Sequence, residues 1–206
     1  KQVFGAMDID IWEVIEAAKT KPFGFMPFYP GPGLGGHCIP IDPFYLTWKA
    51  REHGMSSRFI ELAGEINTYM PNYVVLTIIK ALNHHRKPVK GSKILIIGLA
   101  YKPDIEDERE SPSYELMNKL EQLGAEVSYY DPYITEIKMT RENSHLAGLM
   151  SVDWSEETIR SFDAVAISTA HRVVNYQELA QFSNIIVDCR NVMGARKIDD
   201  FKVWKA

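Results

Sequence analysis

The sequence has few cysteines and no long run of apolar residues. The only cysteines among its 206 residues are Cys38 and Cys189. They are too far apart for a paired metal-ligand motif, so we expect no metal site. Two cysteines also argue against a disulfide framework, which favours a reducing cytoplasm. No apolar run approaches the roughly 20 residues of a membrane span, and residues 1–14 lack the apolar core of a secretion signal.

An excess of positive charge is absent as well. The formal net charge is −4 and the pI is about 5.9, which argues against nucleic acid or a membrane surface as a partner. The length suits one large domain or two small ones. The sequence also lacks an initiator methionine and opens within a helix-like pattern, so we expect a fragment of a longer chain.

The first part of the sequence shows helical periodicity interrupted by one irregular segment. Apolar residues recur at helical spacing in residues 8–20, and the pattern is helical again from about Asp42 to Gly54. Residues 21–43 are so rich in proline and glycine that most of them cannot form helix or central strand. Aromatic residues in this segment argue against disorder, so we expect a functional loop.

Residues 56–85 predict one long helix or two abutting helices, with Pro71 marking a kink or a break. The apolar stripe is broad enough for burial on more than one side. It fits a helix between domains, a dimer interface or a core helix of a single domain.

The second part alternates between apolar strands and helices. We expect strand 92–100, helix 111–123, strand 125–131, a short helix, strand 163–170, helix 175–182 and strand 184–190. This order predicts an α/β fold with a Rossmann-like, doubly wound parallel sheet. Its ligand crevice should lie beyond the C-terminal strand ends. The chain thus divides into a central helical region, 1–90, and a Rossmann-like domain, 91–206.

Gly31, Gly33 and Gly36 satisfy the G-x-G-x-x-G spacing of a dinucleotide-binding loop. That motif needs a strand before it and a helix after it. Prolines in GFMPFYP exclude a central strand, and prolines in HCIPIDP stand where the helix should propagate. The turn after the first apolar strand, GLAYKPD, has no second or third glycine. We therefore predict that neither segment binds a dinucleotide alone.

The glycines before Cys38 could instead surround a substrate while exposing the thiol. Asp42 would reach the same site if the chain turns at Pro40 or begins a helix there. Two alternatives remain. Cys38 could be a small buried hydrophobic residue, the usual fate of a free cysteine. It could also be the nucleophile of a cysteine hydrolase, which requires a histidine within reach, such as His53 or His171, because adjacent His37 points away in an extended segment.

Four motifs resemble those of a known family. GPGLGGHCIPIDPFYL, residues 31–46, resembles the active-site loop of the nucleotide-sugar 6-dehydrogenases, the UDP-glucose/GDP-mannose dehydrogenase family. GLAYKPDIEDERESPS, YDPY and DCRN match three further family motifs in the expected order, so the resemblance covers nearly the whole chain. Residues 19–43 most resemble the branch that oxidises UDP-N-acetylglucosamine in bacterial polysaccharide pathways. UDP-N-acetylmannosamine, UDP-glucose and GDP-mannose are the alternative substrates.

The resemblance implies three parts: an N-terminal NAD-binding Rossmann domain, a central helical region with the dimer interface, and a C-terminal Rossmann-like nucleotide-sugar domain. This sequence matches the last two. The NAD-binding glycine loop and the family's catalytic lysine and asparagine are expected to precede Lys1. The resemblance thus implies an oxidoreductase fragment that is inactive alone, with NAD as cofactor, a UDP-sugar as substrate and a homodimer through the 56–85 helix.

The resemblance also implies roles for individual residues. Cys38 would add to the C6 aldehyde as a thiohemiacetal and later form a thioester, and Asp42 would assist water or proton transfers. The substrate-binding residues would be Gly33, Gly35, Gly36, Phe28, Tyr29, Lys102 and Arg190, with the two aromatic residues near the base or ribose. Arg109 would cross to the cofactor.

Alternatives to these roles stay open. Lys102 and Arg109 stand among five acidic residues and could belong to a solvated face. Asp131 and Asp188, at strand ends, are expected to be structural turn residues, and Cys189 is expected to pack. The whole chain could also be a UDP-sugar-binding or dimerisation module without catalysis.

Overall fold

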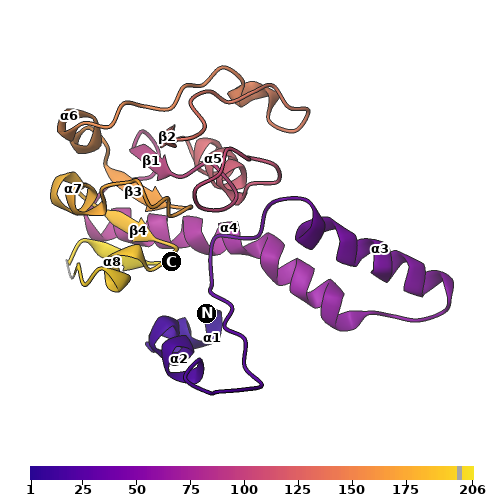
Figure 1. The fold of residues 1–206 in the computed structure, drawn as a ribbon. Helices are drawn as coiled ribbons and strands as arrows, with labels where there is room; N and C mark the ends of the chain where they lie inside the picture. The colour runs from indigo at the N-terminus through magenta and orange to yellow at the C-terminus, as the bar shows by residue number, and fades with distance from the viewer. Residues whose placement is uncertain (199–200) are drawn as a thin grey trace.

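The computed structural model describes residues 1–198 and 201–206. A small N-terminal lobe of α1 and α2 is followed by a projecting hairpin of α3 and α4, and the rest of the chain forms a sheet covered by helices (Figure 1). The helices are α1 Gln2–Ala6, α2 Ile11–Ala18, α3 Cys38–Glu52, α4 Arg58–His84, α5 Pro112–Gln122, α6 Glu156–Arg160, α7 Tyr176–Phe182 and α8 Val192–Ala195, with a 3₁₀ turn at Ser144–Leu146. In the described ranges, every helix is too short or too polar to cross a membrane.

Five parallel strands form one sheet in the order β2-β1-β3-β4-β5. They are β1 Lys93–Ile97, β2 Glu126–Tyr130, β3 Ala164–Ile167, β4 Ile186–Asp188 and β5 Val203–Lys205. The chain leaves β1 for β2 on one side and later returns to β3 on the other, so the topological switch point lies between β1 and β3. The crevice beyond their carboxyl ends is the expected ligand position of such a sheet.

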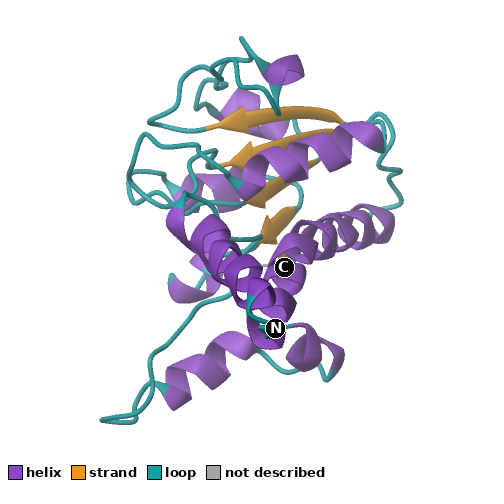
Figure 2. Cartoon of the chain, turned by 90° about the vertical axis from the view of Figure 1, so that its right-hand side faces the viewer, coloured by secondary structure: helices purple, strands orange, loops and turns teal. Residues whose placement is uncertain are grey.

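Helices cover both faces of the sheet, which confirms the doubly wound α/β prediction (Figure 2). Ile94 and Ile96 of β1 pack with α4 and α5, whereas Leu95 and Ile97 pack with α6, α7 and α8. Successive side chains of a strand point to opposite faces, so a strand that is apolar at every position requires two covers.

Helix α4 is one continuous helix of 27 residues, and Pro71 does not break it. Its second half is buried against the sheet, where Val74, Ile78 and Leu82 have no exposed surface. Its first half pairs with α3 and leaves Phe59 89% exposed. The second half of α4 is therefore a core helix, whereas its first half leaves apolar side chains exposed.

Two expectations for residues 38–43 were wrong: that the helix begins near Asp42, and that the prolines there prevent a helix from propagating. The helix after the glycine loop begins at Cys38, not near Asp42, and it continues through Pro43. Pro40 lies in the first turn, where its missing N–H would have no partner within the helix in any case. Residues 21–37 form no strand, so the absence of a strand alone rejects the dinucleotide motif. The sequence also did not predict α8 and β5, because each is at most four residues long.

Gly98 follows the last residue of β1 and has a backbone conformation that favours glycine. Its φ is +87°, and a Cβ there would lie 2.4 Å from the Thr169 carbonyl oxygen of the neighbouring strand end. We expect Gly98→Ala to lower the free energy of unfolding by about 3 kcal/mol, measured by urea denaturation. Gly148→Ala is the matched control, because its φ is +83° but no atom lies within 4 Å of the added Cβ. Equal losses in the two variants would show that the contact with Thr169 is unimportant.

Candidate active site

The glycine loop, residues 31–37, lies against the carboxyl ends of the strands. The Gly36 N–H donates to the Arg109 carbonyl oxygen at 2.8 Å, and the Leu34 N–H donates to Asn67 Oδ1 of α4 at 2.8 Å. At its start the loop touches Arg190, whose guanidinium lies directly beside Gly31. The loop is therefore held between α4 and the loops that follow β1 and β4.

Two of these glycines allow a close approach to Tyr101. A Cβ on Gly35 would lie 2.5 Å from the Tyr101 Cβ, and one on Gly36 would lie 2.9 Å from the Tyr101 ring. Gly36 also has a φ of +86°. A side chain at either position would push the loop off the residues after β1. The glycines thus serve loop packing, and their predicted contact with a sugar remains a prediction.

Cys38 is exposed and is the first residue of α3. The backbone N–H groups of a first helical turn have no partner within the helix and favour negative charge beside them. Asp42 is also exposed and follows four residues later, so it lies on the same face of the helix. The structure thus satisfies the helical condition for Cys38 and Asp42 to share one site, and it excludes the buried alternative for Cys38.

Arg190 lies at the end of β4, next to the switch point. Its Nε donates to the Ser168 carbonyl oxygen at 2.7 Å, and its backbone N–H donates to Asp188 Oδ1 at 2.9 Å. Burial lowers the pKa of the guanidinium from its ordinary value, while the nearby Cys189 and Asp188 oppose that change. An arginine with so high an ordinary pKa stays cationic at neutral pH. The other oxygen of Asp188 accepts from the Met193 N–H, as expected of a structural turn residue.

Lys102 and Arg109 are both exposed on the segment between β1 and α5. Lys102 Nζ lies 5.3 Å from the centre of the Tyr101 ring. Arg109 forms an ion pair with Asp107, with 2.7 Å between Nη2 and Oδ2. This ion pair raises the pKa of Arg109. The Arg109 carbonyl oxygen also accepts from the Gly36 N–H, so Arg109 lies beside the glycine loop that leads to Cys38.

Phe28 and Tyr29 lie in the segment between α2 and the glycine loop, residues 19–30, which we call the strap. Phe28 is 78% exposed. Tyr29 stacks on Trp12 of α2 with ring centres 5.6 Å apart, and its hydroxyl donates to Glu16 at 3.1 Å. Tyr29 thus anchors the strap to α2, and a base or ribose contact for either aromatic residue remains a prediction.

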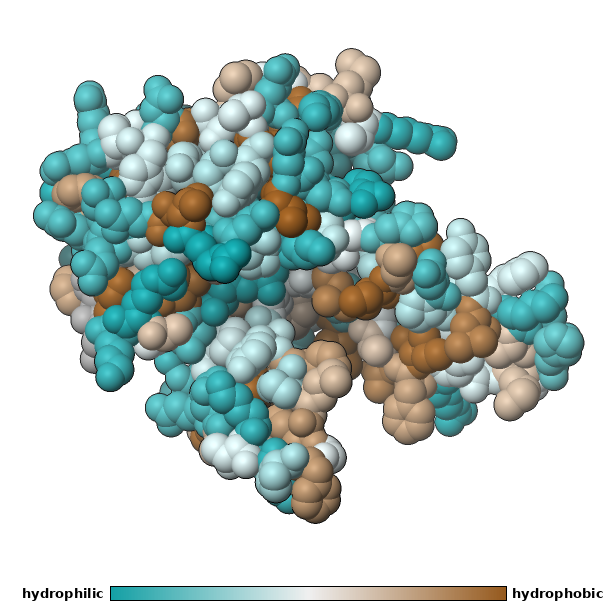
Figure 3. All heavy atoms as spheres, viewed as in Figure 1, coloured by the Kyte–Doolittle hydropathy of each residue, from teal (hydrophilic) through white to brown (hydrophobic). Residues whose placement is uncertain are grey.

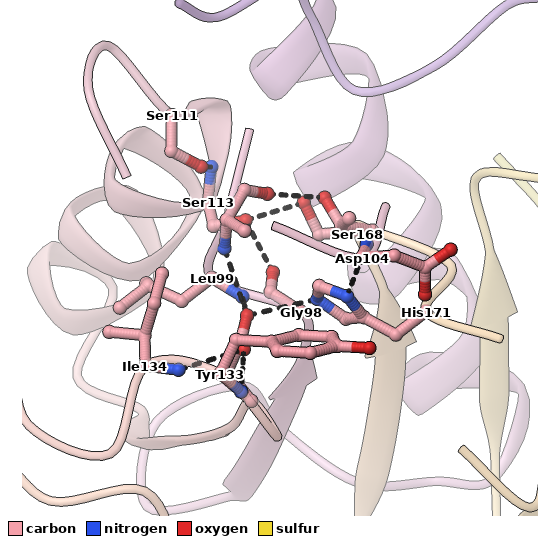
Figure 4. A network of polar contacts seen from close by, with 12 residues as sticks. Gly98, Leu99, Asp104, Ser111, Ser113, Tyr133, Ile134, Ser168 and His171 are labelled. Atoms are coloured by element: carbon pink, nitrogen blue, oxygen red, sulfur yellow. Dashed lines mark hydrogen bonds and ion pairs between the residues drawn. The ribbon is translucent and has the colours of Figure 1, made fainter. Parts of the chain in front are cut away.

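A buried polar network underlies the crevice (Figure 4). At its centre the Asp131 carboxylate, 2% exposed, accepts hydrogen bonds from the loops after β1 and β2 and from the His171 ring. Burial would raise the pKa of Asp131, but the hydrogen bonds from His171, Ala100 and Tyr133 lower it below its ordinary value. Asp131 is structural, as expected. The sequence analysis did not predict the hydrogen bonds of His171 to Asp131 and Asp104, although its position in STAHR, at a strand end, indicated a place near the crevice.

The hydrolase alternative fails on geometry. His171 has no exposed surface and is bonded to Asp131 and Asp104. His53 follows the far end of α3, roughly 22 Å along the helix from Cys38. Within the described residues, no histidine forms a hydrogen bond with Cys38. Cys189 is fully buried, and this burial raises the pKa of its thiol to about 12, so it packs as expected.

A cleft of about 1030 Å³ opens on the other side of the glycine loop. Its walls are the loop, the starts of α3 and α5, and the exposed half of α4. Cys38, Lys102 and Arg190 are not among the residues that line it. The cleft therefore adjoins the candidate site and shares Gly33, Gly36 and Arg109 with it.

Models of two domains of one protein family match the chain. The model described as "UDP-glucose/GDP-mannose dehydrogenase family, central domain" matches residues 1–69, and that described as "UDP-glucose/GDP-mannose dehydrogenase family, UDP binding domain" matches residues 95–195. The UDP-N-acetyl-D-glucosamine 6-dehydrogenase of Pseudomonas aeruginosa is 30% identical over 203 residues, covering 96% of this chain and 46% of that protein. The UDP-N-acetyl-D-mannosamine dehydrogenase of Campylobacter jejuni is 32% identical, covering 81% and 38%.

Solved structures agree with these matches. A UDP-D-ManNAc dehydrogenase from Pyrococcus horikoshii has a TM-score of 0.76 at 28% identity, covering 96% of this chain and 44% of that one. A UDP-glucose dehydrogenase from Pyrobaculum islandicum has a TM-score of 0.76 at 26% identity, covering 98% and 44%. The chain spans less than half the length of these relatives.

Proposed function

The chain belongs to the UDP-glucose/GDP-mannose dehydrogenase family, and from that premise we propose that it binds a UDP-sugar across the crevice and supplies Cys38 for oxidation of the sugar's C6 alcohol to a carboxylate. The observation that carries this proposal is the exposed Cys38 thiol at the start of α3, beside a glycine loop that contacts Tyr101, Arg109 and Arg190. Arg190 and Lys102 would neutralise the diphosphate.

The proposed chemistry uses sulfur to retain the aldehyde. After the first oxidation, the Cys38 Sγ forms a bond to C6, and the thiol proton ends on the C6 oxygen, giving a thiohemiacetal. The second oxidation removes a hydride and a proton and leaves a thioester, which water hydrolyses to the carboxylate and the free thiol. Asp42, one helical turn from Cys38, would hold or accept a proton from that water. NAD⁺ would be the hydride acceptor in both oxidations.

The described residues do not provide a complete dinucleotide site. The turn after β1 contains Gly98 but not the second and third glycines of the dinucleotide motif, and Gly31, Gly33 and Gly36 follow no strand. We therefore assign only Arg109 a contact with the cofactor. We also expect the 206-residue chain alone to bind a UDP-sugar without forming NADH.

Relatives act on several sugars by name, including UDP-N-acetyl-D-glucosamine and UDP-N-acetyl-D-mannosamine. We propose a UDP-N-acetylhexosamine as substrate. UDP-N-acetylglucosamine is the preferred candidate, because the sequence of residues 19–43 most resembles the branch that oxidises it. A UDP-sugar-binding module without catalysis is the second candidate. The exposed thiol disfavours it, because a binding module has no need of one.

Alkylation of Cys38 tests the proposed site. With iodoacetamide, Cys38 should react and Cys189 should not, because only the latter is buried. UDP-N-acetylglucosamine at ten times its Kd should slow the Cys38 reaction about tenfold. Lys102→Ala and Arg190→Ala should weaken this protection. Peptide mass spectrometry follows both cysteines, and UMP, which lacks both the second phosphate and the sugar, serves as the control. Equal rates with and without the UDP-sugar would overturn the proposal.

We also propose a homodimer through the α3–α4 hairpin. Hydrophobic residues gather over this projection (Figure 3). Trp48 is 62% exposed, Leu62 is 51% exposed, and Phe59 also borders the cleft behind the glycine loop. Such a continuous apolar surface is typical of an interface.

The dimer prediction is tested by introducing negatively charged residues into this apolar surface. Phe59→Glu with Leu62→Glu should weaken dimerisation about 100-fold, because two carboxylates would have to be buried against apolar side chains. Size-exclusion chromatography with light scattering over a concentration series measures the mass. Met139→Glu, at an 80% exposed position of the sheet domain, is the control. A wild-type monomer, or an unchanged mass in the double variant, would contradict the assignment.

A further inference from the structure

We propose that His171 and Asp131 together are a positioning element of the active site, which fixes the loop after β1 and through it Lys102 and the glycine loop. This inference rests on the proposed function, since it explains how the UDP-sugar site keeps its shape. Neither residue reaches solvent, with exposures of 0% for His171 and 2% for Asp131. They therefore act through the residues they hold and not by touching a ligand.

The Asp131 carboxylate ties two loops together. Its Oδ2 accepts from the Leu99 N–H at 2.7 Å and from the Ala100 N–H at 2.9 Å, which fixes the start of the loop after β1. Its Oδ1 accepts from the Tyr133 and Ile134 N–H groups at 2.8 and 3.1 Å. One carboxylate thus determines how the ends of β1 and β2 continue into the crevice.

His171 carries this constraint to the other side of Lys102. Its Nε2 lies 3.0 Å from Asp131 Oδ2, and its Nδ1 lies 3.0 Å from the Asp104 backbone nitrogen (Figure 4). A backbone N–H can only donate, so Nδ1 must accept, and in the neutral ring the proton is on Nε2 and points at Asp131.

Asp104 is fixed further by its own side chain. Its carboxylate accepts from the Arg172 backbone N–H at 2.8 Å and from the Arg172 Nε at 2.6 Å. Its backbone has a φ of +62°, a conformation that needs such support. Lys102 therefore stands between two anchored positions, Ala100 and Asp104.

The same loop supports the residues before Cys38. The Tyr101 ring lies under Gly36, and the Tyr101 N–H donates to the Asp107 carbonyl oxygen at 3.0 Å. A shift of the loop would therefore move both Lys102 and the support of the glycine loop. Arg190 is held independently, through Ser168, whose hydroxyl bonds to Ser113 at 2.7 Å. We therefore expect His171 to affect Lys102 and Cys38 together but not Arg190.

Three substitutions separate the two hydrogen bonds of His171. His171→Leu removes both, His171→Asn keeps an acceptor near the Nδ1 position, and His171→Gln keeps a donor near the Nε2 position. The readouts are UDP binding to the chain by calorimetry and protection of Cys38 from alkylation by UDP-N-acetylglucosamine. Leu179→Ala on α7, buried on the opposite face of the sheet, is the control for lost stability.

We expect His171→Leu to raise the Kd for UDP about tenfold and to weaken protection of Cys38, because the loop would spend less time in the binding geometry. His171→Asn should recover most of the affinity. Leu179→Ala should lose thermal stability with unchanged affinity. If His171→Leu does not fold, the comparison of the Asn and Gln variants decides, with tighter UDP binding expected for Asn.

The outcomes separate this inference from the proposed function. Absence of UDP binding to the wild-type chain would overturn the proposed function. Wild-type binding with equal affinity in every His171 variant would overturn only the positioning role. Nitrogen NMR of the His171 ring gives a spectroscopic readout, with the proton expected on Nε2. A proton on Nδ1 would contradict the bond from Asp104.

Discussion

Replacing Cys38 with serine is expected to abolish uronate formation, with a rate loss on the order of 10⁴-fold in the protein combined with the family's NAD-binding domain. A serine hydroxyl adds more weakly to an aldehyde, and the resulting ester is a poorer acyl donor than a thioester. The measurement is the rate of uronate formation at saturating UDP-N-acetylglucosamine, because the first oxidation precedes the bond to Cys38 and can still form NADH. Because Cys38 is exposed, at the end of a loop with few side chains, the substitution should leave the fold unchanged.

UDP binding is the control for this variant. Cys38→Ser should bind UDP as the wild type does, because the diphosphate contacts are assigned to Lys102 and Arg190. Asp42→Asn should give a smaller loss, about 100-fold, because water can replace a proton acceptor in part. Wild-type turnover by Cys38→Ser would remove the covalent step from the mechanism.

Asp131→Asn should give the largest loss of stability, about 3 to 5 kcal/mol at neutral pH. The carboxylate accepts four backbone N–H groups and the His171 ring. An amide offers one oxygen, and its NH₂ group would face donors, leaving buried groups without partners. Urea denaturation monitored by circular dichroism gives the difference. A loss below about 1 kcal/mol would show that the network is not important for the fold.

The same variant should change the response to acid. The folded-state pKa of Asp131 lies below its ordinary value, so its contribution to stability is fully present above the unfolded pKa of about 3.9 and is lost as the pH falls through the folded pKa. Asp131→Asn lacks this term, so its free energy of unfolding should fall less steeply below about pH 4. Glu126→Gln, at an exposed position of β2, should keep the wild-type slope.

The sequence predicted the sheet domain well because its central strands are almost entirely apolar, as in Leu95 and Ile96 of β1. Helix α5 was predicted between Ser111 and Gly124, because a capping serine, an early proline and a closing glycine mark its ends. The start of α3 was predicted too late, because Pro40 and Pro43 suggested a loop, whereas Pro40 lies in the first turn, where proline is tolerated, and the helix continues through Pro43. The structure was needed to show that Pro40 sits in that turn.

The site was predicted only in part from the sequence. Motif resemblance placed Cys38, Lys102 and Arg190 in one site, although they come from three distant segments. The pairing of His171 with Asp131 and Asp104 could not be predicted, because it depends on the register of β2 and β3 on either side of β1. The two roles of α4 were equally hidden, since its apolar stripe is continuous while only its second half meets the sheet.

The proposed thiohemiacetal at Cys38 can be tested without any cofactor. A UDP-sugar 6-aldehyde labelled with ¹³C at C6 is mixed with the chain and followed by carbon NMR. Bond formation between the sulfur and C6 should give a new resonance from a tetrahedral carbon bearing sulfur, which is absent in Cys38→Ser. Identical spectra from the two proteins, with the aldehyde shown to be bound, would contradict the assignment of Cys38 as the group that captures the aldehyde.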